Sequence, residues 1–323
     1  MERLPLIGNE NEWKQLLSLP VSLLLVSVLG SLGMAAGSLI LLGPEDRISV
    51  ARGSWLALLG LVFFVSLYDL LNYVALRTRA GNIFRKKYEL TLFEVLDISN
   101  KTVSAVQAVL SCLTGSVVCI WSCTRNFLRS SHFMSEAYAW FGAAYFFYDI
   151  WSMYQVHTSS FSSSHSIQTR RMSKVKDYIV KQPMILLHHI FIGSFGFLVI
   201  VYLRGGLGDC VFGFVYLMEL STPFVSFRGI LSRLKMKAST LYFVNGLVML
   251  VTFFFCRVMM FPYVCYLYSQ VVGLPFFEAV WLLPSSCKIG IGVLMLPQIY
   301  WFLLMLNGAF KVFAHFSSKQ EHF

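Results

Sequence analysis

The chain has 323 residues, of which 57% are hydrophobic and only 13% are charged. A water-soluble domain carries about a quarter charged residues, so this composition excludes an ordinary soluble enzyme and indicates an integral membrane protein. The net charge of +10 does not indicate nucleic-acid binding, because the basic residues lie in short connections between apolar runs.

Eight apolar runs follow one another, each close to the ~20 residues that a helix needs to cross about 30 Å of hydrocarbon. Lipid offers no partner to backbone N–H and C=O groups, so each run is predicted to be a helix. The first could also be a signal peptide, but it is longer than the usual ~7–15 residues, which favours a retained span. The runs are Leu19–Leu42, Gly53–Leu76, Val103–Cys123, Ala137–Val156, Met184–Leu203, Asp209–Phe227, Thr240–Tyr266 and Cys287–Phe310.

Lys and Arg are distributed unequally between the two sides of this predicted bundle. The side that holds the N-terminus has 19 of the 26 and the opposite side has 5, while Arg257 and Lys288 lie within runs. The positive-inside rule therefore predicts that both chain ends are cytosolic. On the same side, Ser159–Ser166 is rich in serine and is predicted to be a flexible linker, followed by a basic segment facing the anionic leaflet.

The seven cysteines form no CxxC pair and no Cys/His spacing typical of zinc. Most lie inside or at the ends of apolar runs, so they are predicted to be packing residues and not a disulfide framework. No metal and no bound cofactor is expected.

Ionisable residues within spans are costly, so each is a functional candidate. Several lie about 6–12 Å from the cytosolic ends of their helices at ~1.5 Å of rise per residue. This shared depth predicts a polar cavity open to the cytosol, although polar groups near span ends are also simply less costly. Arg257 lies nearer the other side and could either pair with Glu219 or reach outward. The residues at the shared depth are Asp69, Gln107, Asp149, His188, His189, Glu219 and Asn245.

His188 and His189 are adjacent on one helix and point about 100° apart, which is unsuited to binding one metal together. One imidazole facing the interior could act as a base or a nucleophile, and a structural role is equally open. Pro223 follows Glu219 and is predicted to bend the helix, either around a cavity or at an irregular packing contact; Pro297 permits the same two interpretations.

Six strings together resemble the TLC-domain family, named for translocation-associated membrane proteins, longevity-assurance ceramide synthases and a ceroid-lipofuscinosis protein. The resemblance covers about 53–313 and is strongest to the subgroup "family with sequence similarity 57". The strings are SAVQAVLSCLTG (104–115), YFFYDIW (145–151), LLHHIFI (186–192), GDCVFGFVYLMELSTPFVS (208–226), NGLVMLVTFFFCRVMMFPY (245–263) and PQIYWFLLML (297–306).

The resemblance implies an all-α membrane protein in which a TLC-type bundle of six core transmembrane helices is joined by two N-terminal helices. It divides the chain into an N-terminal segment with an extra helix (1–52), a helix and basic loop (53–98), the TLC domain (99–313) and a short cytosolic tail (314–323). It also implies residence in the endoplasmic reticulum, with the Golgi and the plasma membrane as alternatives.

In ceramide synthases the paired histidines serve acyl transfer from acyl-CoA to a sphingoid base. By resemblance, His188 and His189 would be catalytic, with Asp149 and Glu219 as orienting carboxylates. Tyr145, Asn245 and Arg257 would bind substrate, and the partners would be membrane lipids, acyl-CoA and a sphingoid base. The HDxxD motif of ceramide synthases is missing, since its region reads GDCVFGFVYLMEL. A non-catalytic lipid-binding or lipid-composition regulator is therefore the alternative.

Overall fold

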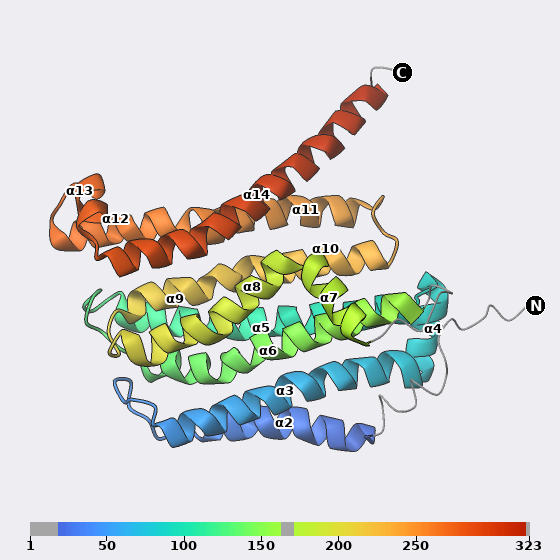
Figure 1. The fold of residues 1–323 in the computed structure, drawn as a ribbon, viewed down its shortest axis with the longest axis horizontal. Helices are drawn as coiled ribbons and strands as arrows, with labels where there is room; N and C mark the ends of the chain where they lie inside the picture. Colours follow the sequence, from blue (N-terminus) through green and yellow to red (C-terminus); the bar gives the residue numbers. More distant parts are fainter. Residues whose placement is uncertain (1–18, 163–170, 321–323) are drawn as a thin grey trace, which may run out of the picture.

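The computed structural model describes residues 19–162 and 171–320, and all regular structure within these residues is helical. The main helices run along the long axis of the molecule in alternating directions (Figure 1). In chain order they are α2 (Val21–Gly37), α3 (Val50–Arg77), α5 (Leu92–Ser122), α6 (Phe133–Ser162), α8 (Pro183–Phe191), α9 (Asp209–Leu217), α10 (Thr222–Arg233), α11 (Thr240–Phe253), α12 (Met260–Val272) and α14 (Ser285–Gln320).

Three short helices lie at the ends of this bundle: α4 (Arg79–Tyr88), α7 (Arg171–Lys181) and α13 (Phe276–Leu282). Irregular helical turns connect or extend several of the main helices. Two π-helical segments, Ile192–Gly196 and Val199–Leu203, extend α8. A 3₁₀ turn, Met218–Ser221, joins α9 to α10, and a π-helical segment, Phe254–Val258, leads from α11 towards α12.

Within the described residues, six helical segments are long and apolar enough to cross a membrane. The prediction of an all-α, multi-pass membrane protein is confirmed. Helix α6 has 30 residues but carries Glu136, Asp149 and many tyrosines, and it packs in the interior against α3, α5 and α8. Helix α2 has only 17 residues, which is shorter than the predicted run and near the lower limit for a span.

One other predicted boundary is wrong. The serine-rich segment was predicted to begin a flexible linker at Ser159, but α6 continues through Ser162; the rest of that segment, 163–170, lies outside the described residues. Helix α14 continues to Gln320, into the segment that is predicted to be a short tail from 314. Helical backbone hydrogen bonds favour continuing a helix beyond the apolar part of its sequence.

Side-chain caps fix where several helices begin. The Thr91 hydroxyl accepts a hydrogen bond from the Glu94 amide while the Glu94 carboxylate accepts from the Thr91 amide, so a capping box starts α5. The hydroxyl of Ser239 accepts from the Tyr242 amide at the start of α11. These caps set the rotation of two helices whose side chains line the cavities described below.

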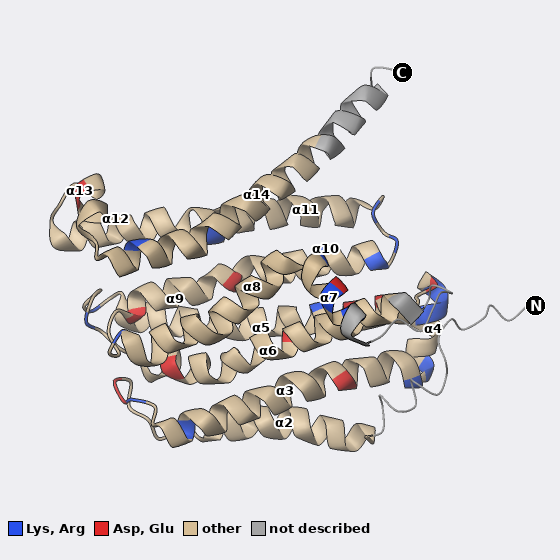
Figure 2. Ribbon diagram, in the orientation of Figure 1, with Lys and Arg blue, Asp and Glu red and all other residues tan. Residues whose placement is uncertain are grey.

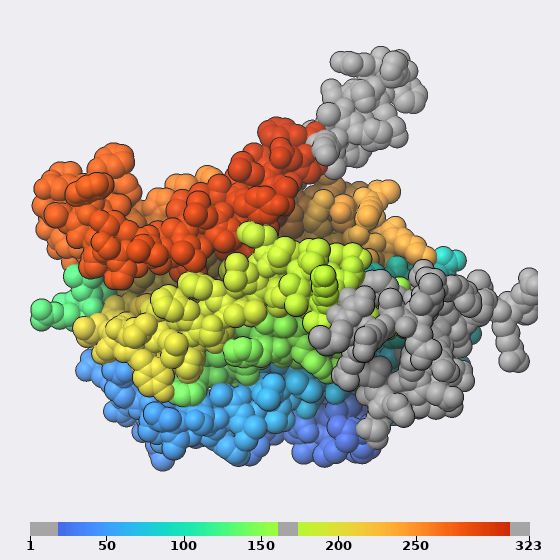
Figure 3. Space-filling view, in the orientation of Figure 1, coloured from blue at the N-terminus to red at the C-terminus, as the bar shows by residue number. Residues whose placement is uncertain are grey.

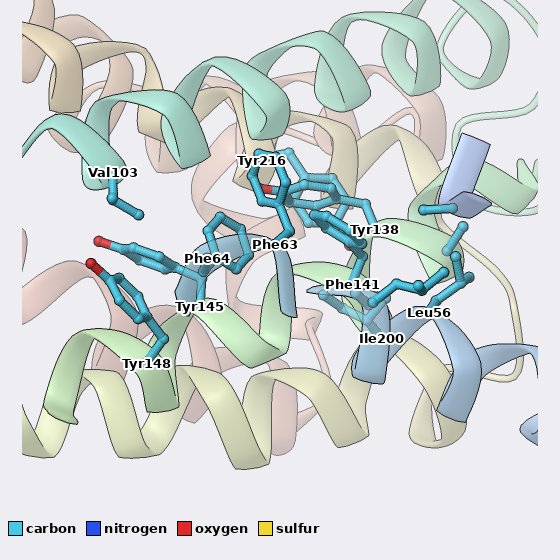
Figure 4. Close-up of a cluster of buried hydrophobic side chains, with 14 of the residues drawn as sticks. Leu56, Phe63, Phe64, Val103, Tyr138, Phe141, Tyr145, Tyr148, Ile200 and Tyr216 are labelled. Carbon is cyan, nitrogen blue, oxygen red and sulfur yellow. The ribbon is translucent and has the colours of Figure 1, made fainter. Parts of the chain in front are cut away.

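An aromatic core holds α3 against α6. Phe63 and Phe64 meet Phe141 with ring centroids 5.7 and 5.6 Å apart, and Phe64 meets Tyr145 edge to face (Figure 4). A Cβ atom on Gly60 would lie 2.2 Å from the Phe141 carbonyl oxygen, so glycine is needed for this close helix contact. This packing fixes α6, which carries Asp149 and Tyr145.

A disulfide bond joins Cys123, just after α5, to Cys210 at the start of α9. This corrects the prediction that the cysteines are only packing residues. The two cysteines are separated by 87 residues in sequence, and the fold brings these helix ends together. Pairing of that kind cannot be deduced from spacing alone.

The two ends of the bundle differ in charge. Lys and Arg gather at the end that holds α4, α7 and the α10–α11 connection, whereas few lie at the opposite end near α13 (Figure 2). The alternating helix directions therefore place the basic connections together, as the charge count predicts.

Candidate functional site

A cavity of about 840 Å³ lies among α5, α6, α8, α10 and α14, towards the basic end of the bundle. We call it the polar cavity. It is lined by all four residues predicted to be catalytic, Asp149, His188, His189 and Glu219, and also by Tyr145 and Arg257. The fold therefore brings these side chains together around one space, as expected.

Asp149 from α6 and His189 from α8 face each other inside this cavity. The Asp149 Oδ2 atom lies 3.1 Å from His189 Nδ1, although the contact lacks the alignment of a hydrogen bond. Asp149 is only 3% exposed, and its Oδ1 atom has no hydrogen-bond partner among the described residues. A carboxylate in this position holds the imidazole from its Nδ1 side and directs the opposite nitrogen, Nε2, away from itself.

His188 occupies a different environment from its neighbour. Its ring contacts the Trp301 ring of α14 edge to face at 5.2 Å, and the two imidazole centroids are 5.8 Å apart. Successive residues on a helix diverge by about 100°, which explains why only His189 meets Asp149. Thus His188 lies against an aromatic wall, while His189 has a carboxylate partner.

Glu219 and Arg257 form a buried ion pair, with Arg257 Nη2 3.1 Å from Glu219 Oε2. The guanidinium also donates to the Ser221 hydroxyl, the Thr222 hydroxyl and the Gln298 side-chain oxygen. Of the two open interpretations of Arg257, pairing with Glu219 is therefore correct. Glu219 accepts from Thr222 and Arg257, and among the described residues it has no hydrogen bond to either imidazole.

Irregular backbone brings this pair together. Glu219 lies in the 3₁₀ turn before Pro223, and Arg257 lies in the π-helical segment after α11. Proline cannot donate to the carbonyl four residues earlier, and a π-helical turn rotates the side chains that follow it. The predicted irregularity at Pro223 is confirmed, whereas the one at Arg257 has no proline to signal it.

Helix α5 supplies a polar stripe that is not among the predicted site residues. Asp97, Asn100, Lys101 and Ser104 recur at helical spacing, and all four line the polar cavity. The amide of Asn100 donates to the Ser152 hydroxyl at 2.7 Å, and the Tyr145 hydroxyl donates to Ser104 at 2.9 Å. This spacing at the start of a span is the signal that could have identified them.

Charged side chains lie where the cavity opens towards the basic end. Asp97 accepts from Lys101 at 2.6 Å and from Arg233 at 2.5 Å. On α7, Asp177 contacts Lys181 and His157, each at 2.9 Å. The hydrogen bond from Lys181 holds the pKa of Asp177 below its usual range, with His157 adding to the effect.

A smaller apolar chamber of about 190 Å³ adjoins the polar cavity. The two spaces share His188, Glu219, Arg257 and Phe146 as lining residues, while most of the chamber wall is aliphatic or aromatic. The histidine and the ion pair therefore stand between a polar space and an apolar one. Such a junction suits a molecule with a polar reactive group and a hydrocarbon chain.

Three other residues at the predicted depth lie outside the polar cavity. The Asn245 amide donates to the Phe224 carbonyl at 2.9 Å and packs α11 against α10, so this predicted substrate-binding residue does not line the cavity. Gln107 lines the apolar chamber and bonds to Tyr138. Asp69 on α3 lines neither space. Depth along a helix does not determine which way a side chain points.

Among the described residues, no group of three or more His, Cys, Asp and Glu side chains is arranged to hold a metal ion. The site therefore consists of one carboxylate–imidazole contact, a second imidazole, an ion pair and several hydroxyl groups. These groups are suited to proton transfer and to acyl transfer through nitrogen.

Comparison with known proteins supports one family. The family model for the TLC domain matches residues 97–307, which is more than half of the chain. The human protein named TLC domain-containing protein 4 is 32% identical over 115 residues, covering 35% of this chain and 44% of the relative, so the match spans less than half of that protein. No solved structure matches. The matched region contains every residue of the polar cavity named above, and the chain belongs to the TLC-domain family of lipid-related membrane proteins.

Proposed function

We propose that this protein is an acyl-CoA-dependent N-acyltransferase of the ceramide-synthase type, acting on a sphingoid base. One observation carries the proposal: the Asp149–His189 contact lies inside a polar cavity that adjoins an apolar chamber at His188. An acyl thioester and a long-chain amine both have a polar reacting centre and an apolar tail, and this arrangement suits both.

His189 acts as the general base in this scheme. Its Nε2 atom takes a proton from the neutral amine as the amine nitrogen attacks the thioester carbonyl. The carbon–sulfur bond then breaks, the imidazolium returns the proton to sulfur, and the products are an amide and free coenzyme A. In a variant scheme the imidazole nitrogen attacks the thioester first, the carbon–sulfur bond breaks, and coenzyme A leaves as a thiolate from an acyl-imidazole. The amine then attacks this acyl group, the bond from carbon to the imidazole nitrogen breaks, and the amine proton passes to the thiolate.

The surrounding groups position the reactants. Asp149 orients His189 through Nδ1 and stabilises the imidazolium that forms. Tyr145 directs its hydroxyl into the cavity beside Ser104. Glu219 and Arg257 neutralise each other, so they shape the wall between cavity and chamber instead of orienting an imidazole. Lys101 and Arg233 at the opening are suited to the coenzyme phosphates.

The same proposal includes membership of the "family with sequence similarity 57" subgroup and residence in the endoplasmic reticulum with the basic end cytosolic. The charge asymmetry supports this orientation. The Cys123–Cys210 disulfide supports it independently, because it lies at the opposite end, where an oxidising lumen would maintain it.

The alternative function is a non-catalytic lipid-binding protein that regulates membrane lipid composition. The missing HDxxD motif favours it. In that case the polar cavity would bind a lipid, and neither imidazole would be needed for the cellular effect.

The deciding experiment is an assay of the purified full chain in detergent with acyl-CoA of several chain lengths and sphinganine. The proposal expects amide formation that His189→Ala abolishes and Asp149→Asn lowers by about tenfold or more. The matched control is Asn245→Ala, a buried polar substitution outside the cavity. Amide formation by the His188→Ala, His189→Ala double variant equal to that of wild type would reject the catalytic proposal.

Cells lacking the protein distinguish the alternative. If the same double-histidine variant, folded and present at normal level, restores the lipid profile as well as wild type, the regulator is supported. Failure of that variant to restore the profile supports catalysis.

A further inference from the structure

A second cavity lies between the α10–α11 hairpin and α14, and its charges differ from those of the polar cavity. Its volume is about 530 Å³. We call it the hairpin groove. Figure 3 shows the first half of α14 lying over the bundle. The groove is lined by Arg228, Lys237, Ala238, Ser239, Thr240, Tyr242, Phe243, Gly246, Leu247, Met249, Leu250, Met305 and Ala309.

The groove is polar at one end and apolar at the other. Arg228, Lys237 and Thr240 lie at the basic end of the bundle, whereas Leu250 lies ten residues further along the α11–α12 span. At ~1.5 Å per residue, the groove extends about 15 Å along α11 from the basic end towards the middle of the bundle. This is the polarity profile of a lipid headgroup followed by its acyl chains.

Arg228 of α10 lies against α11, and its described partners carry no negative charge. The guanidinium donates to the Tyr242 carbonyl at 3.2 Å and stacks on the Tyr242 ring at 4.0 Å, and both partners are neutral. A Cβ atom on Gly246 would lie 2.2 Å from Arg228 Nη1, so glycine leaves the room that the guanidinium occupies. The side chain is therefore fixed in the groove.

No carboxylate lines the hairpin groove among the residues that the structure describes. The polar cavity differs, because there Asp97 pairs with both Lys101 and Arg233, and Glu219 pairs with Arg257. Two cations without an acidic partner, beside an apolar groove at the membrane surface, favour an anionic occupant with hydrocarbon tails.

We propose that the hairpin groove binds one anionic phospholipid from the leaflet at the basic end, with its phosphate on Arg228 and Lys237 and its acyl chain along α11 and α14. Basic pockets between transmembrane helices bind anionic lipid headgroups by this chemistry. The lipid would link the α10–α11 hairpin to α14. Its binding does not depend on the proposed acyl transfer.

The test is native mass spectrometry of the full chain released from nanodiscs made of equal parts phosphatidylcholine and phosphatidylserine. Wild type is expected to retain phosphatidylserine in preference to phosphatidylcholine. Arg228→Gln and Lys237→Gln should each lower that preference about fivefold, since each cation contributes about 1 kcal/mol to the attraction. Lys176→Gln on α7, an exposed lysine at the same end, is the matched control and should leave it unchanged.

Two further measurements keep the proposal falsifiable. Ala309→Trp fills the groove without changing charge and should also remove the retained lipid. Equal retention by wild type, both charge variants and Ala309→Trp overturns the proposal. Thermal protection by inorganic phosphate as large as that by phosphatidylserine would point to a soluble anion and overturn it too. A change of oligomeric state in Ala309→Trp, with lipid retention unaltered, would assign the groove to a second copy of the chain.

Discussion

Glu219 and Arg257 show how a charged pair persists inside an apolar bundle. Either charge alone would be costly in hydrocarbon, and here each is neutralised by the other, while three neutral groups take further guanidinium donors. The geometry depends on residues from three separate spans, which contribute Ser221, Arg257 and Gln298. The pair therefore both fixes the helix packing and closes one side of the polar cavity.

Breaking this pair should destabilise the protein strongly. Arg257→Met leaves a buried carboxylate without its cation and should cost about 3–5 kcal/mol, whereas the double variant Glu219→Gln, Arg257→Met should recover much of that loss. Thermal unfolding of detergent-purified protein measures the difference. The exposed pair Glu89–Lys235, 2.8 Å apart, is the matched control, and Lys235→Gln should cause no measurable change. Equal tolerance of Arg257→Met and Lys235→Gln would contradict this account.

Substitutions of Asn245 and Tyr145 should separate effects on stability from effects on activity. Asn245→Ala removes a hydrogen bond between α11 and α10 and should cost about 1 kcal/mol of stability, yet activity per folded molecule should persist, since the side chain lies outside the polar cavity.

Tyr145→Phe keeps the ring but removes a hydroxyl within the cavity. It should therefore lower activity while changing the melting temperature less than Asn245→Ala does. The reverse pattern in both variants would show that the cavity is misassigned.

At the residue scale, the sequence predicted the centre of the site but not its rim. The cost of burying charge identified Asp149, His189 and Glu219, and the fold brings them to one cavity. The same depth argument wrongly included Asn245, because depth gives no rotation about the helix axis. Asp97 and Lys101 escaped notice because they precede the apolar run, although their spacing with Ser104 marks one helical face.

At the scale of single elements, regular helices were predictable and their irregular turns were only partly so. The proline after Glu219 marked a bend from sequence alone, and the 3₁₀ turn lies there. The π-helical segment around Arg257 has no such marker, since it results from packing between α11, α12 and α14. Uniform rise along that span placed Arg257 too far from Glu219.

The Cys123–Cys210 disulfide should stabilise the contact between α5 and α9. Closing a loop of 87 residues contributes up to about 4–5 kcal/mol in the chain-entropy model, and less here because membrane insertion already restricts the unfolded helices. Substitution of both cysteines by serine should lower the melting temperature. Replacing Cys287, which is exposed and unpaired among the described residues, is the control. Mass spectrometry that finds Cys123 and Cys210 as free thiols in protein isolated with alkylation would refute the bond.

The contacts of Asp177 at the cavity opening, with Lys181 on α7 and with His157 on α6, should weaken in acid. Lys181 lowers the pKa of Asp177 in the folded protein, so the contact stabilises α7 above the ordinary carboxyl pKa. That stability is lost as pH falls through the lowered folded pKa, below about pH 4. Hydrogen exchange of 174–181, corrected for intrinsic rates, should rise in acid, and Asp177→Asn should show the faster exchange already at neutral pH. Unchanged exchange in that variant would remove Asp177 as the cause.

For the molecule as a whole, the sequence predicted the alternating passes well and the burial of α6 less well. Apolar length predicts the span Ala137–Val156 but not its burial, and α6 carries Glu136, Asp149 and several tyrosines because other helices cover it. Its polar and aromatic side chains are satisfied internally, as by the Asn100–Ser152 and Tyr145–Ser104 contacts. Whether such a span faces lipid or other helices is recognised from the bundle around it, and its sequence alone does not distinguish the two.

The charge asymmetry and the disulfide make one joint prediction about orientation. Basic connections at one end and a cystine at the other agree only if the basic end is cytosolic and the cystine end lies in an oxidising lumen. Glycosylation acceptors inserted at 205–207 and at 273–275 should therefore be modified in microsomes, while one inserted at 88–91 should remain unmodified. Protease added outside the sealed microsomes should cleave at 88–91 and spare the other two sites. The opposite pattern would place the opening of the polar cavity in the lumen, out of reach of cytosolic acyl-CoA, and the proposed acyl transfer would lose its co-substrate.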